Sequence, residues 1–323
     1  MRRPRDEGAL VRVKRATRCL AGACAVAAAV VVPAVAFDSP AASASTAGYW
    51  LEAGDGGVFN FGVPFWGSAA SDPADCPVDP PARSMPDGSC WSMAATPGNL
   101  GYWVINAYSG VIYRYGNAGD YGSPADTTRY IGAADLWPTS IGIASTPDGK
   151  GYWVLELGLS GLGSVQAFGD AAYYGDELSN LPTAGHVGMP VAMAATPDGR
   201  GYWIVDSDGG VFSFGNARFY GSMGGQVLDA AVVSMTATGD GGGYWLAASD
   251  GGVFSFGDAP FGGSMAGTTL TRPVIGIAAD RGGGYWLGAA DGGVFALGGA
   301  PFLGSMGGSA LARPVFSIVA GRS

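Results

Sequence analysis

Three features of the sequence predict an all-β fold built from six similar units. The triplet Gly-Tyr-Trp occurs six times, with a period of 41 to 53 residues, at Gly48, Gly101, Gly151, Gly201, Gly243 and Gly284. Each period contains four short apolar segments separated by turn residues, and no helical pattern follows the N-terminal segment. Four short strands per repeat of this length are typical of the blades of a β-propeller. The sequence therefore predicts a six-bladed β-propeller of four-stranded blades.

The fifth unit illustrates how each blade is built. A strand around Tyr244–Leu246 and a second over Val253–Phe256 flank the turn Ser249–Gly252, which predicts a β-hairpin. A further turn at Gly257–Pro260 precedes a short predicted strand over Phe261–Ser264. The fourth strand comes from an apolar run ahead of each triplet.

The two ends of the repeat region predict a closed ring. The first triplet, at Gly48, has no apolar run before it, whereas the run Arg313–Ile318 near the C-terminus has no triplet after it. We expect this last run to join the first blade, which would remove the exposed edges of an open array. A β-sandwich would not need six near-identical units, and a β-helix would need shorter coils. A seventh blade is not expected, because the insert between Cys76 and Cys90 has no strand pattern.

Residues 1–36 have the pattern of a secretory signal peptide. Seven basic residues precede the apolar stretch Leu20–Val35, and Ala34–Ala36 forms an A-x-A cleavage site. Ala42–Ala44 offers a second site. The alternatives are a retained membrane anchor and a lipoprotein through Cys24, although its lipobox is poor and the apolar run is short. The expected organisation is a signal peptide over 1–36, a linker over 37–47 and the propeller over 48–323.

Charge narrows the range of partners. Seven of the 17 basic residues and two of the 26 acidic residues lie in 1–36, so the remaining chain carries a net charge near −14. Nucleic acid and anionic lipid are therefore not expected as partners. No stable membrane insertion is expected after cleavage, and we expect the protein to be secreted or associated with the cell wall.

Two cysteines remain after the predicted signal peptide. Cys76 and Cys90 flank a Pro-rich stretch, and most of it forms the insert loop 69–89. In an oxidising compartment we expect a Cys76–Cys90 disulfide. Zinc is the weaker alternative, because two cysteines without histidine cannot complete a site.

The repeated positions suggest structure more than chemistry. The six inner apolar runs, the last of them taken over Pro314–Ala320, contain no Asp, Glu, His, Lys or Arg, and His186 is the sole histidine of the chain. We therefore expect no catalytic residue, metal or cofactor. The recurrent turn aspartates could suggest calcium, but the remaining oxygen ligands are missing and turn geometry explains them. The triplet Tyr and Trp could stack on sugars, although packing between blades is favoured.

Differences between blades point to a binding surface. The residue five positions after the triplet glycine is polar in three consecutive blades, at Asn106, Glu156 and Asp206. The alternative is that these residues occupy solvated strand ends. The connections to the next triplet are also longest between blades one and four, and we expect them on the face of the Asp-Gly-Gly turns. The aromatic residues expected as anchors there are Tyr121, Tyr130, Trp137, Tyr173 and Tyr174.

The repeats resemble the Gly-Tyr-Trp/Asp-Gly-Gly-Val-Phe repeats of secreted bacterial proteins, in an order similar to NHL-type propellers. The match covers about residues 48–323 and is most specific in the last three units. Units two and three depart from it, with Tyr108-Ser109-Gly110 and Leu159-Ser160-Gly161 in place of Asp-Gly-Gly. The resemblance implies fold and location, and it carries no catalytic residue.

Three functions remain open from the sequence. The first is a secreted, non-catalytic propeller that binds a glycan or protein at the cell envelope. The second is an extracellular hydrolase or lyase acting on polysaccharide, with Glu156 and Asp206 as its acid/base pair. The third is a structural protein of the cell wall.

Overall fold

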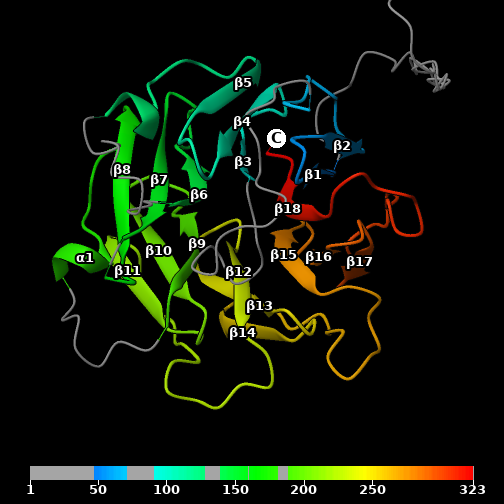
Figure 1. Ribbon diagram of the computed structural model, residues 1–323. Coiled ribbons are helices and arrows are strands. Elements are labelled where there is room, and N and C mark those ends of the chain that lie inside the picture. The colour runs from blue at the N-terminus through cyan, green and yellow to red at the C-terminus, as the bar shows by residue number, and fades with distance from the viewer. Residues whose placement is uncertain (1–46, 71–90, 128–138, 159, 181–187, 323) are drawn as a thin grey trace, which may run out of the picture. The chain divides into compact units, whose positions relative to one another are not determined.

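Six antiparallel sheets follow one another along the chain, each made by one Gly-Tyr-Trp repeat (Figure 1). The computed structural model describes residues 47–70, 91–127, 139–158, 160–180 and 188–322. All of them belong to one compact unit, Ala41–Ser323. The all-β fold with six blades, predicted from the repeats, is confirmed.

Each blade pairs an inner, a middle and an outer strand. Blade 1 combines β18 (Val315–Ala320), β1 (Tyr49–Ala53) and β2 (Val58–Phe61), and blade 2 combines β3 (Trp91–Ala95), β4 (Gly101–Asn106) and β5 (Ile112–Gly116). Blade 3 contains β6 (Thr139–Ser145), β7 (Gly151–Leu157) and β8 (Gly163–Gly169), and blade 4 contains β9 (Pro190–Ala195), β10 (Gly201–Asp206) and β11 (Val211–Gly215). Blade 5 is β12 (Val232–Ala237), β13 (Gly243–Ala248) and β14 (Val253–Gly257), and blade 6 is β15 (Val274–Ala279), β16 (Tyr285–Ala289) and β17 (Val294–Leu297).

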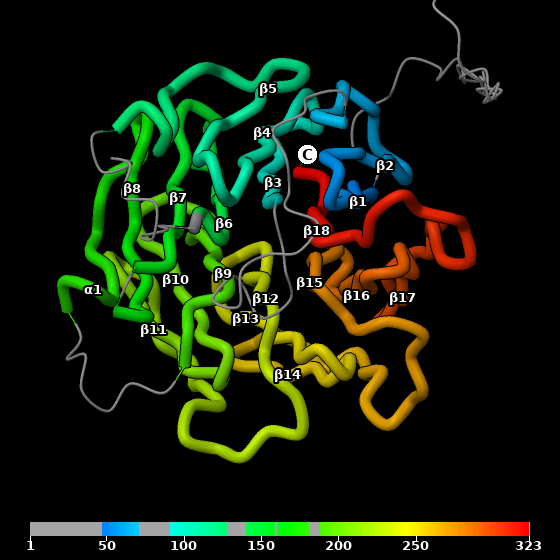
Figure 2. The backbone as a smooth tube through the Cα atoms, in the orientation of Figure 1, coloured from blue at the N-terminus to red at the C-terminus, as the bar shows by residue number. Residues whose placement is uncertain are grey.

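The inner strands form a closed cycle. Strands β3, β6, β9, β12, β15 and β18 each contact the next, and β18 contacts β3 (Figures 1 and 2). Strand β18 also pairs with β1 in register, with Tyr49 opposite Ala320 and Leu51 opposite Ile318. The first blade is thus assembled from both ends of the repeat region.

The blades have three strands in the described residues, where the sequence predicted four. The expected fourth strand, Phe261–Ser264 in blade 5, makes no ladder. Its segment lies between two blades: the preceding Pro260 carbonyl accepts a hydrogen bond from the Trp245 indole, and the Gly263 carbonyl accepts one from Tyr285 of blade 6. Gly263 has a φ of 111°, a left-handed conformation that interrupts an extended strand.

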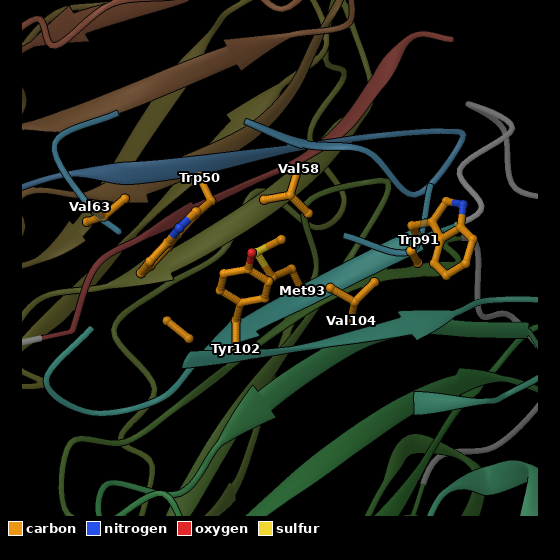
Figure 3. Close-up of a cluster of buried hydrophobic side chains, with 9 residues drawn as sticks. Trp50, Val58, Val63, Trp91, Met93, Tyr102 and Val104 are labelled. Carbon is orange, nitrogen blue, oxygen red and sulfur yellow. The ribbon is translucent and has the colours of Figure 1, made fainter. Parts of the chain in front are cut away.

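The triplet aromatics fill the interfaces between blades. All six Trp and all six Tyr are fully buried. On a strand these two residues point to opposite faces, so each Trp meets the Tyr of the next blade. Trp50 faces Tyr102 across the first interface, with Val58 and Met93 beside them (Figure 3). The ring centroids lie 5.0 to 5.7 Å apart in all six interfaces, including Trp286 with Tyr49.

Helical structure is confined to two short segments of the described chain, the 3₁₀ turn Pro124–Asp126 and α1 (Glu177–Asn180). Neither of them is long and apolar enough to cross a membrane.

Removing one interface tryptophan should destabilise the propeller strongly. Trp203→Ala deletes a side chain that is 1% exposed, and we expect it to lower the free energy of unfolding by about 3–5 kcal/mol. Phe219→Ala, in the same blade but 55% exposed, should change it by less than about 0.5 kcal/mol. Denaturant titration measures both values. Equal shifts for the two variants would contradict this assignment of the core.

Candidate functional site

The ring has two faces with different turns. The turns between middle and outer strands, such as Ser207–Gly210, define what we call the hairpin face. The connections between blades meet this face, because Met223, Met265 and Met306 donate backbone hydrogen bonds of 2.8 to 2.9 Å to the turn glycines Gly209, Gly251 and Gly292. In the longer connections after blades 1 and 2, Ala69 donates a 2.9 Å backbone hydrogen bond to Gly56 and Ala125 donates one of 3.4 Å to Gly110. The placement of these two connections beside the hairpin turns, expected from the sequence, is thereby confirmed. The turns between inner and middle strands, such as Thr196–Gly201, define the opposite face.

A central cavity of about 580 Å³ lies along the axis of the ring. The inner strands line it with alanine, serine, threonine, isoleucine and methionine side chains. Its charged lining residues within the described chain are two arginines, Arg281 and Arg322, just beyond the inner runs. The expectation of an uncharged channel was based on the inner runs, and these two arginines lie outside them.

The three predicted polar residues lie at the ends of middle strands, but they do not share a surface. Asn106, Glu156 and Asp206 are each at most 2% exposed. The Asn106 Oδ1 accepts hydrogen bonds from the backbone of Tyr108 and Ser109, which stabilises the hairpin turn. The prediction that these residues line a binding face is therefore wrong for their side chains: each is enclosed by blade packing.

Glu156 and Asp206 occupy different blade interfaces. Each shares a strand face with its triplet tyrosine, four residues earlier, and that tyrosine packs against the preceding blade. Glu156 accepts a 2.7 Å hydrogen bond from Gln166 of its own sheet. Neither residue lines the central cavity. The structure does not bring them together as a catalytic pair.

Asp206 is instead bonded to another acid, which the sequence analysis missed. Its side chain shares a hydrogen bond with Glu177 of α1, and both residues are almost fully buried. Two carboxyl groups can bond in this way only if one of them holds a proton. Burial raises the pKa of Asp206 to about 7; the hydrogen bond with Glu177 opposes this effect, and the charge of Asp208 adds to it.

Glu177 and its neighbour Asp176 also cover the outer edge of blade 3. Glu177 Oε2 accepts a 2.8 Å hydrogen bond from the Gly163 backbone, and Asp176 Oδ2 accepts one of 3.1 Å from Val165. Both donors lie on β8, the outermost strand of that blade. Carboxylates thus satisfy edge groups that would otherwise be free to pair with another strand.

A further buried acid lies in the interface of blades 1 and 2. Glu52 is fully buried, and neither of its carboxyl oxygens has a hydrogen-bond partner among the described residues. Burial raises the pKa of Glu52 well above its ordinary value. The corresponding residues of blades 5 and 6 are Ala247 and Gly288, so these buried acids belong to the half of the ring with long connections.

Two of the predicted aromatic anchors are packing residues. The hydroxyls of Tyr121 and Tyr174 donate to the carbonyls of Gly149 and Gly199 in the next blade, at 3.2 and 3.0 Å. Tyr173 is 52% exposed and remains available as a surface residue. Tyr130, Trp137, Cys76, Cys90 and His186 lie outside the described residues.

Exposed aliphatic residues occur at the hairpin ends of blades 2, 3 and 4. Val111 follows the hairpin turn of blade 2, Leu178 lies on α1, and Met189 directly precedes β9. They are 37%, 41% and 38% exposed. Their presence on the irregular blades makes this surface the candidate binding site.

Comparisons with known proteins show a similarity of fold and no similarity of sequence. No protein-family model matches the chain, and no curated protein matches it by sequence. Among solved structures, it is similar to the β-propeller domain of Cps50 (Swd1) from Myceliophteria thermophila. That match has 10% identity and a TM-score of 0.41, and it covers 68% of this chain and 72% of the other. The six sheets and their closed order define the protein as a β-propeller.

No group of three or more His, Cys, Asp and Glu residues is placed to hold a metal ion in the part of the chain that the structure covers.

The bonded acids should make stability depend on pH. The raised pKa of Asp206 means that its contribution is fully present below about pH 4 and is lost as the pH rises to about 7. Asp206→Asn carries no titrating group at this position, so its free energy of unfolding should fall less over that range. Asp229→Asn, at an exposed position, is the matched control and should keep the slope of the original protein. Denaturant titrations from pH 4 to 8 measure the slopes; identical slopes for all three proteins would refute the shared proton.

Proposed function

We propose that this protein is a secreted, non-catalytic β-propeller that binds a protein partner at the cell envelope through the hairpin face of blades 2 to 4. The observation that carries the proposal is the exposure of Val111, Leu178 and Met189, one at the hairpin end of each of these three blades. In the regular blades 5 and 6, the place of Val111 is taken by Gly252 and Gly293.

A protein partner suits these side chains better than a glycan. Sugars are commonly bound by flat aromatic rings, but Tyr121 and Tyr174 are engaged between blades. Aliphatic groups of intermediate exposure, set among polar turns, match the apolar centre and polar rim of protein interfaces. A glycan partner is the alternative that the experiment below distinguishes.

The structural roles of the acids support a non-catalytic reading. A polysaccharide hydrolase needs two carboxyl groups on one cleft. Glu156 is bonded within its own sheet and Asp206 is bonded to Glu177, in separate interfaces. Both acids therefore serve the packing of blades.

Secretion is proposed from the sequence of residues 1–36. Their basic start, apolar stretch and A-x-A site form a signal-peptide pattern. The net negative charge of the remaining chain favours neutral or basic partner surfaces over polyanions.

Binding can be tested with charged substitutions on the candidate surface. We expect the triple variant Val111→Glu, Leu178→Glu, Met189→Glu to lose capture of the envelope partner by at least about tenfold, because three buried charges would have to be desolvated in the complex. Val227→Glu, a fully exposed aliphatic position between blades 4 and 5, is the matched control and should bind normally. Quantitative pull-down from an envelope fraction, with each variant checked for folding, gives the ratio.

Enzymatic treatment of the envelope fraction separates the alternatives. Loss of capture after protease treatment supports a protein partner, whereas loss only after polysaccharide digestion would point to a glycan and overturn the proposal. Equal capture by the triple variant and the control would exclude this surface. Self-assembly of the purified protein without any partner would favour a structural role.

Export can be tested on the protein recovered from the culture medium. Intact-mass measurement should show a chain beginning at Phe37 or Ser45, because the two A-x-A sites end at Ala36 and Ala44. It should also show no thiol that reacts with an alkylating reagent before reduction and two that react afterwards, which would establish the Cys76–Cys90 disulfide. A full-length chain found only inside the cells would contradict secretion.

A further inference from the structure

One position breaks the repeat at the rim of the central cavity. It is the second residue after each inner strand, on the face opposite the hairpin face. From blade 2 to blade 5 it holds a small or cyclic neutral residue, and in blades 6 and 1 it holds an arginine; in order, the residues are Pro97, Pro147, Pro197, Gly239, Arg281 and Arg322. All six line the cavity. The two arginines belong to adjacent blades, so positive charge is concentrated on one sector of the rim.

Arg322 extends across this mouth. Its Nη1 donates to the Ser145 carbonyl of blade 3 at 3.2 Å and also to the Ser145 hydroxyl, although Arg322 itself follows the inner strand of blade 1. Its own carbonyl accepts a hydrogen bond from the Asn99 backbone of blade 2. The guanidinium therefore lies over the channel, held by neutral partners.

The electrostatic environment of Arg322 favours an added negative charge. Burial and the nearby positive charge of Arg281 both lower the pKa of the Arg322 guanidinium. In the described part of the chain, no carboxylate lies within 4 Å of the Arg322 guanidinium. A largely buried guanidinium whose described partners are neutral is costly, and a bound oxyanion would compensate it with charge-assisted hydrogen bonds.

The aspartates of the same turns are directed elsewhere. Asp148, Asp198 and Asp240 each accept a hydrogen bond from the backbone two residues later in their own turn, and none of the three lines the cavity. Behind the arginines, the wall consists of neutral side chains such as Ile143, Met193 and Ile277. A volume of about 580 Å³ is within the range of small-molecule sites.

We propose that the mouth of the central cavity at Arg281 and Arg322 is a binding site for the oxyanion of a small molecule, a carboxylate or a phosphate, with the uncharged remainder of the ligand inside the channel. The guanidiniums bind the anionic group, and the inner strands contact the rest. This site is separate from the hairpin face, so neither proposal depends on the other.

Titration calorimetry with two simple probes tests the site. Sodium phosphate and sodium hexanoate are titrated into the purified protein against sodium chloride at matched ionic strength, because exposed charges are screened by salt. We expect saturable heat from at least one probe. Tighter binding of hexanoate would identify a carboxylate with an apolar tail, and tighter binding of phosphate would identify a phosphorylated ligand.

Variants locate the binding. Arg322→Gln and Arg281→Gln should each weaken it about tenfold or more, the loss expected for a charge-assisted hydrogen bond. Arg272→Gln, an exposed arginine in the connection before β15, should bind as the original protein does. If Arg322→Gln fails to fold, Arg281→Gln alone tests the binding site. No saturable heat from either probe, or unchanged binding in Arg281→Gln, would overturn the proposal and leave Arg322 as a tie between blades.

Discussion

The contact between a tryptophan and the tyrosine of the next blade is the interaction on which the ring depends. In every interface the indole N–H bonds to a carbonyl in the segment that leaves its own blade, and the tyrosine hydroxyl bonds to a glycine carbonyl a few residues later in that segment. One segment is thus held from both sides by two buried rings. This arrangement satisfies the polar atoms of large aromatic side chains, so burying them carries no unpaired hydrogen-bonding group.

The number of blades could be predicted because the triplet marks a buried strand that repeats visibly. The strand count could not, since Phe261–Ser264 has strand-like residues whose neighbouring carbonyls are taken by Trp245 and Tyr285. The burial of Asp206 in a blade interface could have been predicted. It lies four residues after Tyr202 on the same strand, and residues at even spacing share a face. If the tyrosine packs against the preceding blade, so does the acid. Its partner Glu177 could not be foreseen, because it comes from a connection that carries no repeat.

Departures from the repeat divide the ring into two unlike halves. Buried acids at Glu52, Glu156 and Asp206 occupy the interfaces among blades 1 to 4, whereas the other blades have alanine or glycine at the corresponding positions. The arginines of the cavity mouth lie at blades 6 and 1, so blade 1 carries both a buried acid and an arginine. The blades share one backbone pattern, but the buried charged residues are distributed unequally among them. Such residues are costly in a packed interface unless their polar atoms are hydrogen-bonded, as Glu177 is to the Gly163 backbone.

The pairing of β18 with β1 joins segments separated by most of the chain: the Tyr49 hydroxyl bonds to Gly304, 255 residues away. Contacts between residues so far apart raise the contact order, and folding slows as contact order rises. The first blade can be completed only after residues 315–320 have been synthesised and brought to residues 49–53. Until then β1 lacks its inner neighbour, and the nascent chain presents an unpaired strand that a chaperone or an unfolded-state export pathway would have to protect.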